Sequence, residues 1–161
     1  GDPGMAPLCR EAGCGVVVMH MRGEPRTMQE APCYDDVVAE VREFLAGRCG
    51  GLVAAGLDPD CLCFDPGIGF GKTVGHNLAL LRAAGSLAPA GRPLLIGVSR
   101  KSFIGRVLGD DALELREWPT VALTALAREA GVRIHRVHSV RQNLAAMRMA
   151  EAVMGDLNVQ R

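Results

Sequence analysis

Several polar side chains follow short apolar segments of the sequence, where they could do chemistry together. Asp65 and His138 stand directly after such segments, Lys101 follows another at a distance of three residues, and Arg136 lies two residues before His138. Short apolar runs rich in Val, Ile and Leu are typical of strands in a parallel sheet. Ligands of parallel sheets bind at the carboxyl ends of the strands. The sequence therefore predicts one ligand site assembled from several strand ends.

The first two of these side chains suit a planar ligand. An ionised carboxylate only accepts hydrogen bonds, so Asp65 could take two parallel N–H bonds from an amidine-like edge. A turn role before Pro66 is an equal alternative. Lys101 is a compact cation suited to a carbonyl oxygen or a ring nitrogen, or else a solvated loop lysine. Ser102 could donate to the same ligand or cap the following helix.

The last apolar segment favours an anion site. Arg136 and His138 are two residues apart on a predicted strand, so they share a face, and together they suit a phosphate. His135 has the opposite parity and is expected to be structural. His20 ends the first predicted strand and also lies at the site end, where a ring satisfied by backbone is the favoured interpretation. These residues together predict a ligand with a planar donor–acceptor edge and an anionic group.

Three alternate glycines follow Asp65 in the sequence GIGFG, at positions 67–71. The loop is not a Walker motif, because the residue five before Gly71 is Pro66, and it does not match the G-x-G-x-x-G dinucleotide pattern. Glycines nevertheless allow a flat ligand to approach the backbone closely. Phe70 could lie against such a ligand, or it could simply anchor the loop.

Composition indicates one ordinary domain of 161 residues. Its 18 basic and 18 acidic residues balance, so charge gives no argument for nucleic acid or a membrane surface as partner. No apolar run approaches the roughly 20 residues that span a bilayer. The first residues lack the pattern of a signal peptide, so a cytoplasmic location is expected. The six cysteines form no C-x-x-C pair, so neither a disulfide framework nor a zinc site is expected.

Strand and helix patterns alternate four times along the chain. Strands are expected at 15–20, 61–64, 94–98 and 132–137, and helices at 34–48, 76–84, 102–108, 119–130 and 140–154. Gly50 and Gly51 are expected to interrupt the first helix, and the tail 156–161 to lack regular structure. Strands that alternate with helices imply parallel pairing with right-handed crossovers. Either an open doubly wound sheet or part of a (β/α)8 barrel fits, and a complete barrel needs about 250 residues.

The apolar stripe of the helix expected at 119–130 would comprise Val121, Ala122, Ala125 and Leu126. The first strand, with three consecutive valines, is expected to be buried on both faces, as strands of parallel sheets are.

Six segments resemble dihydropteroate synthases, a family of pterin-binding enzymes of folate biosynthesis. In chain order they are MHMRGEPRTMQ, YDDVVAEV, FDPGIGFGKT, HNLALL, PLLIGVSRKSFIG and RVH. The order FDPGIGFGK, SRKS and RVH is highly specific. The resemblance implies an α/β fold in which residues 1–161 form one partial pterin-binding domain, the C-terminal half, or last four βα units, of a TIM (β/α)8 barrel.

The resemblance also implies an activity, a cofactor and partners. The family joins 6-hydroxymethyl-7,8-dihydropterin diphosphate to 4-aminobenzoate, giving 7,8-dihydropteroate and diphosphate. Mg²⁺ assists, bound through the substrate diphosphate and a residue of the missing half, so no metal ligand is expected in this half. A homodimer with small-molecule substrates, and without nucleic acid or membrane, is implied. The alternative is a truncated, catalytically inactive fragment that binds pterin or phosphate.

Roles carry over to seven residues. The implied pterin-binding residues are Asp65, Lys101, Met19, Phe70 and Arg136, of which Asp65 and Lys101 are also the implied catalytic residues. The implied aminobenzoate-binding residues are Phe70 and Ser102, and the implied diphosphate-binding residues are Arg136 and His138.

Three features depart from the family. Its first four strands are absent, and half a barrel would expose sheet edges and an apolar inner face, so the chain alone is expected either to be unstable or to self-associate. Ser139 stands where the family usually has Asp after RVH. The segment 116–123, REWPTVAL, replaces a more usual R-L-x-G-S-L-A, and this change is expected to concern packing away from the strand ends.

Overall fold

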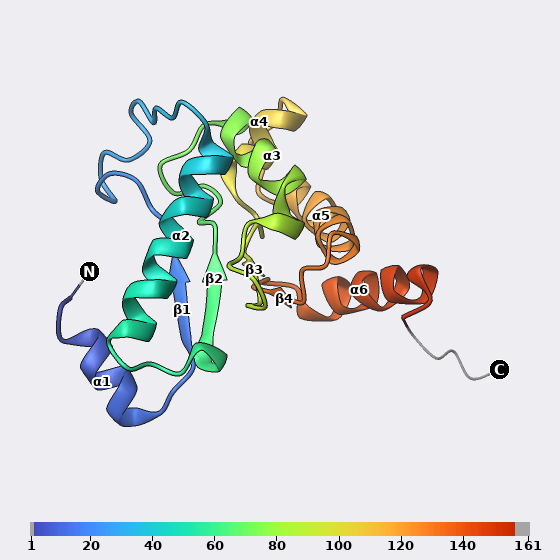
Figure 1. The fold of residues 1–161 in the computed structure, drawn as a ribbon. Coiled ribbons are helices and arrows are strands. Elements are labelled where there is room, and N and C mark those ends of the chain that lie inside the picture. Colours follow the sequence, from blue (N-terminus) through green and yellow to red (C-terminus); the bar gives the residue numbers. More distant parts are fainter. Residues whose placement is uncertain (1, 157–161) are drawn as a thin grey trace.

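Four parallel strands form a single row across the molecule. The structure is a computed structural model that describes residues 2–156. Its strands are β1 Val16–Met19, β2 Leu62–Asp65, β3 Leu95–Ile96 and β4 Ile134–His135. β1 pairs with β2 and β3 with β4, and a parallel bridge between Phe64 and Leu94 joins the two pairs. The row therefore runs in the order β1, β2, β3, β4 (Figure 1).

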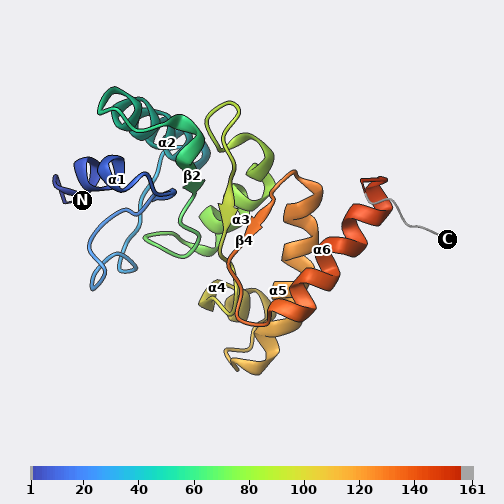
Figure 2. The ribbon, with the colours of Figure 1, turned by 90° about the horizontal axis from the view of Figure 1, so that it is seen from below.

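Helices follow each strand, which confirms the predicted alternation. They are α2 Val37–Ala54, α3 Val74–Arg82, α4 Ser102–Leu108, α5 Glu117–Glu129 and α6 Val140–Met154, with short 3-10 turns at Pro59–Cys61, Ala84–Ser86 and Glu114–Arg116. A further helix, α1 Met5–Ala12, precedes β1 and was not expected from the sequence. Figure 2 shows α1 and α2 at one end of the row of strands, and α5 and α6 at the other. The tail was predicted to lack regular structure from residue 156 onward, and residues 157–161 of it lie outside the described residues.

Helix α2 runs without a break through Gly50 and Gly51, so the predicted interruption there is wrong. Its buried face explains the result, because Leu45 and Leu52 are seven residues apart and both lie in the core. That packing outweighs the cost of about 1 kcal/mol that each glycine adds to a helix interior. Asp36 is the N-cap of the helix, and its carboxylate accepts hydrogen bonds from the backbone N–H groups of Val38 and Ala39.

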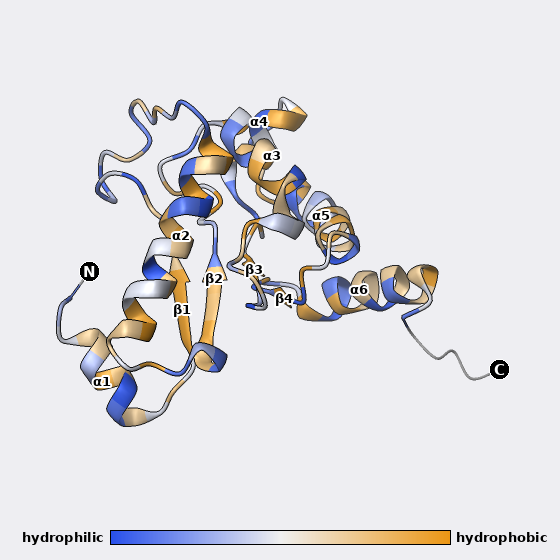
Figure 3. Ribbon diagram, viewed as in Figure 1, coloured by the Kyte–Doolittle hydropathy of each residue, from blue (hydrophilic) through white to orange (hydrophobic). Residues whose placement is uncertain are grey.

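The strands are buried on the helix side only. Phe64 and Ile96 are almost fully buried, whereas Val17 is 53% exposed and Ile134 is 39% exposed. The expectation that β1 is buried on both faces is therefore wrong. Figure 3 shows β1 as apolar, and β2 as apolar except at its carboxyl end, where Asp65 lies. Val17 and Ile134 therefore leave apolar surface exposed on the opposite face of the strands.

Helix α5 turns a polar face inward, contrary to the simple apolar-stripe pattern. Thr120, Thr124 and Arg128 are buried, while Leu126 on the predicted stripe is 61% exposed. The Thr124 hydroxyl donates to Asn143 Oδ1 on α6 at 2.7 Å, and Arg128 pairs with Glu151 at 2.9 Å. These partners satisfy the buried polar atoms, so the apolar stripe can line a groove between α5 and α6 instead.

All six cysteines have free thiols. Between residues 2 and 156, no helix has both the length and the apolar character that crossing a membrane requires.

Candidate functional site

Asp65 lies buried at the carboxyl end of β2, next to Met19 in the strand register. Its Oδ1 accepts a hydrogen bond from the Gly67 N–H at 2.7 Å, so the turn role and a ligand role coexist. Its Oδ2 lies 3.9 Å from Arg136 Nη2. Burial raises the pKa of the Asp65 carboxyl, and the Gly67 N–H and nearby cations act in the opposite direction. Oδ2 is thus the oxygen available to a planar donor edge.

Lys101 follows β3 and reaches back over the glycine loop. Its Nζ lies 4.0 Å from the centroid of the Phe70 ring and donates to the carbonyl oxygen of Ile68. Burial lowers the pKa of the Lys101 amine to about 8, partly offset by the negative charge of Asp65. Lys101 is therefore not a solvated loop lysine. The structure brings Asp65, Phe70 and Lys101 together, as the sequence predicts.

A cavity of about 270 Å³ lies at the ends of β3 and β4. It is lined by Gly97, Ser99, Lys101, Arg136, Val137 and His138. A Cβ added at Gly97 would lie 3.0 Å from Arg136 Nη2, so this glycine makes room for the guanidinium. Two cationic side chains and an imidazole around one cavity make a site for an anion.

The His138 ring is held by Ser99. The Ser99 hydroxyl accepts the His138 backbone N–H at 3.2 Å and lies 2.8 Å from His138 Nδ1. These two contacts with one hydroxyl fix the orientation of the imidazole at the edge of the cavity. His135 instead contacts the carbonyl oxygen of Val132 at 3.2 Å, which agrees with the structural role expected for it.

Ser102 and Met19 lie beside these groups. Ser102 is exposed and is the first residue of α4, where Lys101 occupies the N-cap position and no side chain caps the helix. The capping alternative for Ser102 is therefore wrong. Met19 is partly buried, and its Cγ would lie 3.5 Å from a Cβ added at Gly67. Met19 thus lies against the start of the glycine loop.

The glycines of the loop are required by the protein's own backbone. Gly67, Gly69 and Gly71 all have positive φ, at 67°, 81° and 63°. A Cβ at Gly67 would overlap the carbonyl oxygen of His20, and one at Gly71 would overlap that of Arg22. The loop after β2 therefore packs directly onto the loop after β1.

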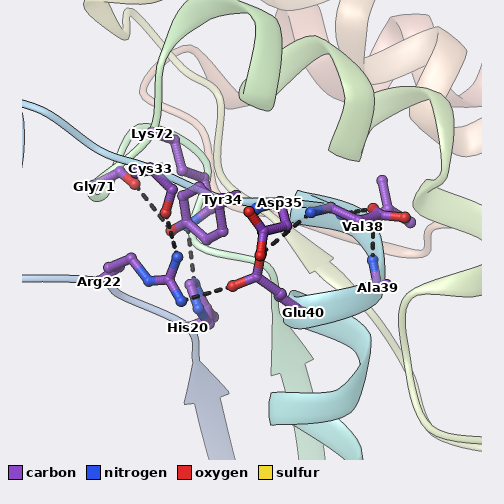
Figure 4. Close-up of polar contacts among 11 residues, drawn as sticks. His20, Arg22, Cys33, Tyr34, Asp35, Val38, Ala39, Glu40, Gly71 and Lys72 are labelled. Carbon is purple, nitrogen blue, oxygen red and sulfur yellow. Dashed lines mark hydrogen bonds and ion pairs between the residues drawn. The ribbon is translucent and has the colours of Figure 1, made fainter.

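Sequence reasoning missed Lys72 and assigned His20 the wrong partner. Lys72 is 2% exposed, and its Nζ lies 3.0 Å from His20 Nδ1 (Figure 4). The same Nζ lies 3.0 Å from the carbonyl oxygen of Phe70. The His20 ring is thus satisfied by an amine and not by backbone. Burial lowers the pKa of His20 to about 4 and that of Lys72 to about 7. The sequence did offer a signal for this contact, because Lys72 is a charged residue at the end of a loop made mostly of glycine and apolar residues.

The loop between β1 and α2 is tied down by Arg22 and Tyr34. Arg22 pairs with Glu40 at 2.7 Å, contacts the carbonyl oxygen of Cys33, and lies 4.2 Å from the centroid of the Tyr34 ring (Figure 4). The Tyr34 hydroxyl donates to the carbonyl oxygen of Gly71 at 2.9 Å. The first turn of α2 thereby fixes both loops that border Asp65.

The segment REWPT holds the backbone just before Lys101. Arg100 has φ of 59° and is the one non-glycine residue with positive φ among those described. Its N–H donates to the Thr120 hydroxyl at 3.2 Å, and its carbonyl oxygen accepts from Arg116 at 3.2 Å. Glu117 pairs with the Arg100 guanidinium at 2.8 Å. The segment 116–120 therefore supports the loop that carries Lys101 at the end of β3. The expectation that it concerns packing away from the strand ends is wrong.

Comparisons with known proteins agree with this arrangement. The sequence profile of the family described as "Pterin binding enzyme" matches residues 1–138. The chain is 41% identical over 153 residues to dihydropteroate synthase of Escherichia coli K12, and 46% identical over 157 residues to that of Mycobacterium leprae. These matches cover 95% and 94% of the chain, but only 54% and 55% of the relatives. The chain thus spans about half the length of the curated relatives it matches.

Solved structures give the same result. A sulfonamide complex of dihydropteroate synthase from Yersinia pestis superposes with a TM-score of 0.91 at 36% identity, covering 97% of this chain and 57% of that one. Dihydropteroate synthase from Thermus thermophilus in complex with 6HMPPP gives 0.88 at 41% identity, with 96% and 61% covered.

The fold and the site thus define an α/β protein that presents a carboxylate, an amine and a guanidinium at the ends of parallel strands. The chain belongs to the pterin-binding enzyme family, and it is similar to about half the length of the dihydropteroate synthases that it matches.

Proposed function

We propose that this chain is the C-terminal half of a dihydropteroate synthase, the last four βα units of a (β/α)8 barrel. The reaction would condense 6-hydroxymethyl-7,8-dihydropterin diphosphate with 4-aminobenzoate in folate biosynthesis. One observation carries the proposal: Asp65, Lys101 and Arg136 come from the ends of three successive strands and meet around one site. A carboxylate, an amine and a guanidinium so placed match a pterin edge beside an anionic group.

The pterin would lie between the strand ends. Asp65 Oδ2 would accept hydrogen bonds from the amino-pyrimidine edge, since Oδ1 is already used by Gly67. Lys101 would donate to the pterin from the opposite side. Met19 and Phe70 would supply the apolar walls, and the Arg136 guanidinium plane would lie against the ring.

The diphosphate and the 4-aminobenzoate would lie beside the pterin, at the ends of β3 and β4 and at the start of α4. Arg136 and His138 line the cavity at the ends of β3 and β4 and would hold the diphosphate. Ser102, exposed at the start of α4, would meet the carboxylate of 4-aminobenzoate, with Phe70 against its ring.

The chemistry asks mainly for positioning and charge. The C–O bond to the leaving group breaks and its electron pair departs with the diphosphate, which Arg136 and His138 stabilise. The aromatic amine then forms the C–N bond at the same carbon and releases a proton. Asp65 and Lys101 act by holding the pterin in line with both groups, because an oriented pair of reactants needs little further activation.

The described residues do not make a Mg²⁺ site of their own. No group of three His, Cys, Asp or Glu side chains in residues 2–156 could hold a metal ion, and the cavity near Arg136 is basic. By the resemblance to the family, we propose that Mg²⁺ would be bound through the substrate diphosphate and a residue of the other half of the enzyme.

The open inner face supports the barrel proposal. Val17 and Ile134 expose apolar surface where four further strands would close a barrel. We expect a homodimer of the cytoplasmic enzyme, working on small molecules without nucleic acid. The groove between α5 and α6, with Leu126, Met149 and Val153 strongly exposed, offers a surface for that dimer.

Two measurements test the function. The first is calorimetric binding of a pterin analogue to this chain, which Asp65→Ala should weaken about 100-fold because a charge-assisted pair of hydrogen bonds is lost. The second is turnover of both substrates by a chimera in which these residues replace the matching part of the Escherichia coli relative. Binding without turnover in a folded chimera favours the inactive pterin-binding fragment. A wild-type chain that binds no pterin analogue contradicts both.

A further inference from the structure

Nearly all basic residues of the chain are arginines, and only two are lysines. Of its 18 basic residues, 16 are arginine, and the two lysines are Lys72 and Lys101. A lysine amine is compact and can direct its three donors separately, whereas a guanidinium is planar and wider. Lys101 is explained by its place in the ligand cavity. Lys72 is not in that cavity, so its use of lysine needs another cause.

Lys72 joins two segments that are far apart in the sequence. Its Nζ lies 3.0 Å from Nδ1 of His20, which directly follows β1 (Figure 4). The same Nζ donates to the Phe70 carbonyl oxygen at 3.0 Å. Its Nζ also lies 6.0 Å from the centroid of the Tyr34 ring. The amine thus links the glycine loop after β2 to the tip of β1.

The link continues to the proposed ligand site. Phe70, whose carbonyl oxygen Lys72 holds, places its ring 4.0 Å from Nζ of Lys101. Burying an amine costs free energy that two hydrogen bonds offset only in part, so stability alone gives little reason for a lysine here. The contacts run from the end of β1 through the glycine loop to Lys101, in the loop between β3 and α4.

We propose that Lys72 is a positioning residue, which fixes the Phe70 backbone so that the Phe70 ring lies against Lys101 and forms one wall of the ligand site. Lys72 acts through Phe70 and does not itself touch the ligand. The proposal rests on the proposed function only for the identity of that ligand, since the contact between Phe70 and Lys101 exists without it.

The test is NMR of the chain labelled with ¹³C and ¹⁵N in lysine alone, which gives one set of signals for each of the two lysines. The Phe70 ring shifts the ε-CH₂ protons of Lys101 upfield, and Phe70→Leu defines their position without the ring. In Lys72→Met these signals should move at least half of the way to the Phe70→Leu position. Arg82→Met, an exposed change on α3, is the matched control and should leave them in place. Unmoved Lys101 signals in a folded Lys72→Met chain overturn the proposal.

A second variant covers the case in which Lys72→Met does not fold. His20→Phe keeps the aromatic contact with Phe44, whose ring centroid lies 4.9 Å away, but removes the Nδ1 acceptor. The Lys101 signals should then move in the same direction by a smaller amount, and an unchanged spectrum again overturns the proposal.

Binding gives an independent readout. Affinity for a pterin analogue should fall about tenfold in Lys72→Met, the scale of one lost hydrogen bond to a charged group. If the wild-type chain binds no pterin analogue while the Lys101 signals still depend on Lys72, the proposed function fails and the positioning role stands.

Discussion

The guanidinium of Arg136 reaches across the tip of β3 to within 3.9 Å of the Asp65 carboxylate. These residues stand at the ends of β4 and β2, and Gly97, which follows β3 between them, leaves the space that the guanidinium occupies. The pair is open on one side, since the Arg136 side chain is 61% exposed and that of Asp65 only 3%. Such a partly exposed ion pair contributes little to stability. Asp65 and Arg136 can therefore separate and each bind a ligand instead.

Gly97→Val should weaken anion binding without unfolding the protein. The added side chain would meet Arg136 Nη2, and the exposed arginine can move away at little cost. We expect the affinity for inorganic diphosphate, measured by calorimetry, to fall about tenfold, the scale of a lost charge-assisted hydrogen bond. Gly97→Ala should have a smaller effect, and the thermal midpoint should change little in both. Unchanged affinity in Gly97→Val would show that Arg136 does not hold the anion.

Gly67→Ala should destabilise the protein far more than Gly91→Ala. Both glycines have positive φ, 67° and 75°, so each alanine pays a similar backbone cost of about 1 kcal/mol. At Gly67 the new Cβ would also overlap the carbonyl oxygen of His20, whereas at Gly91 nothing lies within 4 Å. We expect a loss of more than about 3 kcal/mol for Gly67→Ala in urea unfolding. Equal losses would mean that the two loops do not pack as described.

Much of the site could be predicted from the sequence because it sits at the ends of short strands. Asp65, Lys101 and Arg136 each follow or end a strand whose apolar residues are visible in the sequence. The parallel row then brings them together without further information. The order of strands and helices follows from the same patterns.

The remaining features depend on contacts between distant residues. The pairing of Lys72 with His20 spans 52 positions, and no local pattern encodes it. The continuation of α2 through Gly50 and Gly51 depends on burial of Leu52, which propensity alone does not reveal. The exposure of Val17 depends on which segments cover the inner face, and three valines in a row give no indication of that.

Thr120→Val should loosen the strand end that carries Lys101. The Thr120 hydroxyl donates to the carbonyl oxygen of Arg116 at 2.7 Å and accepts from the N–H of Arg100 at 3.2 Å. Valine has the same shape but leaves both backbone groups unpaired, at a cost of about 1–3 kcal/mol. Thr120→Ser keeps the hydroxyl and is the matched control. Urea unfolding measures the loss, and the two variants behaving alike would argue against this bond.

Lys72 should make stability rise with pH in a window where few other groups titrate. The pKa of Lys72 is about 7 in the folded chain against 10.5 for an ordinary lysine, so above pH 7 the unfolded chain binds the extra proton. The free energy of unfolding then increases with pH by up to about 1.4 kcal/mol per unit. Lys101, with a pKa of about 8, adds to this slope only at higher pH.

Urea unfolding at intervals between pH 6.5 and 8.5 measures this slope. The low pKa of His20, about 4, acts below this range, because an ordinary histidine titrates near 6.5. Burial raises the pKa of the Cys63 thiol, which opposes the slope only near the upper limit. Lys72→Met should abolish the rise between pH 7 and 8, while Arg82→Met should preserve it. A rise that persists in Lys72→Met would show that the Lys72 amine keeps its proton in the folded chain, and that its environment is more polar than its burial beside His20 implies.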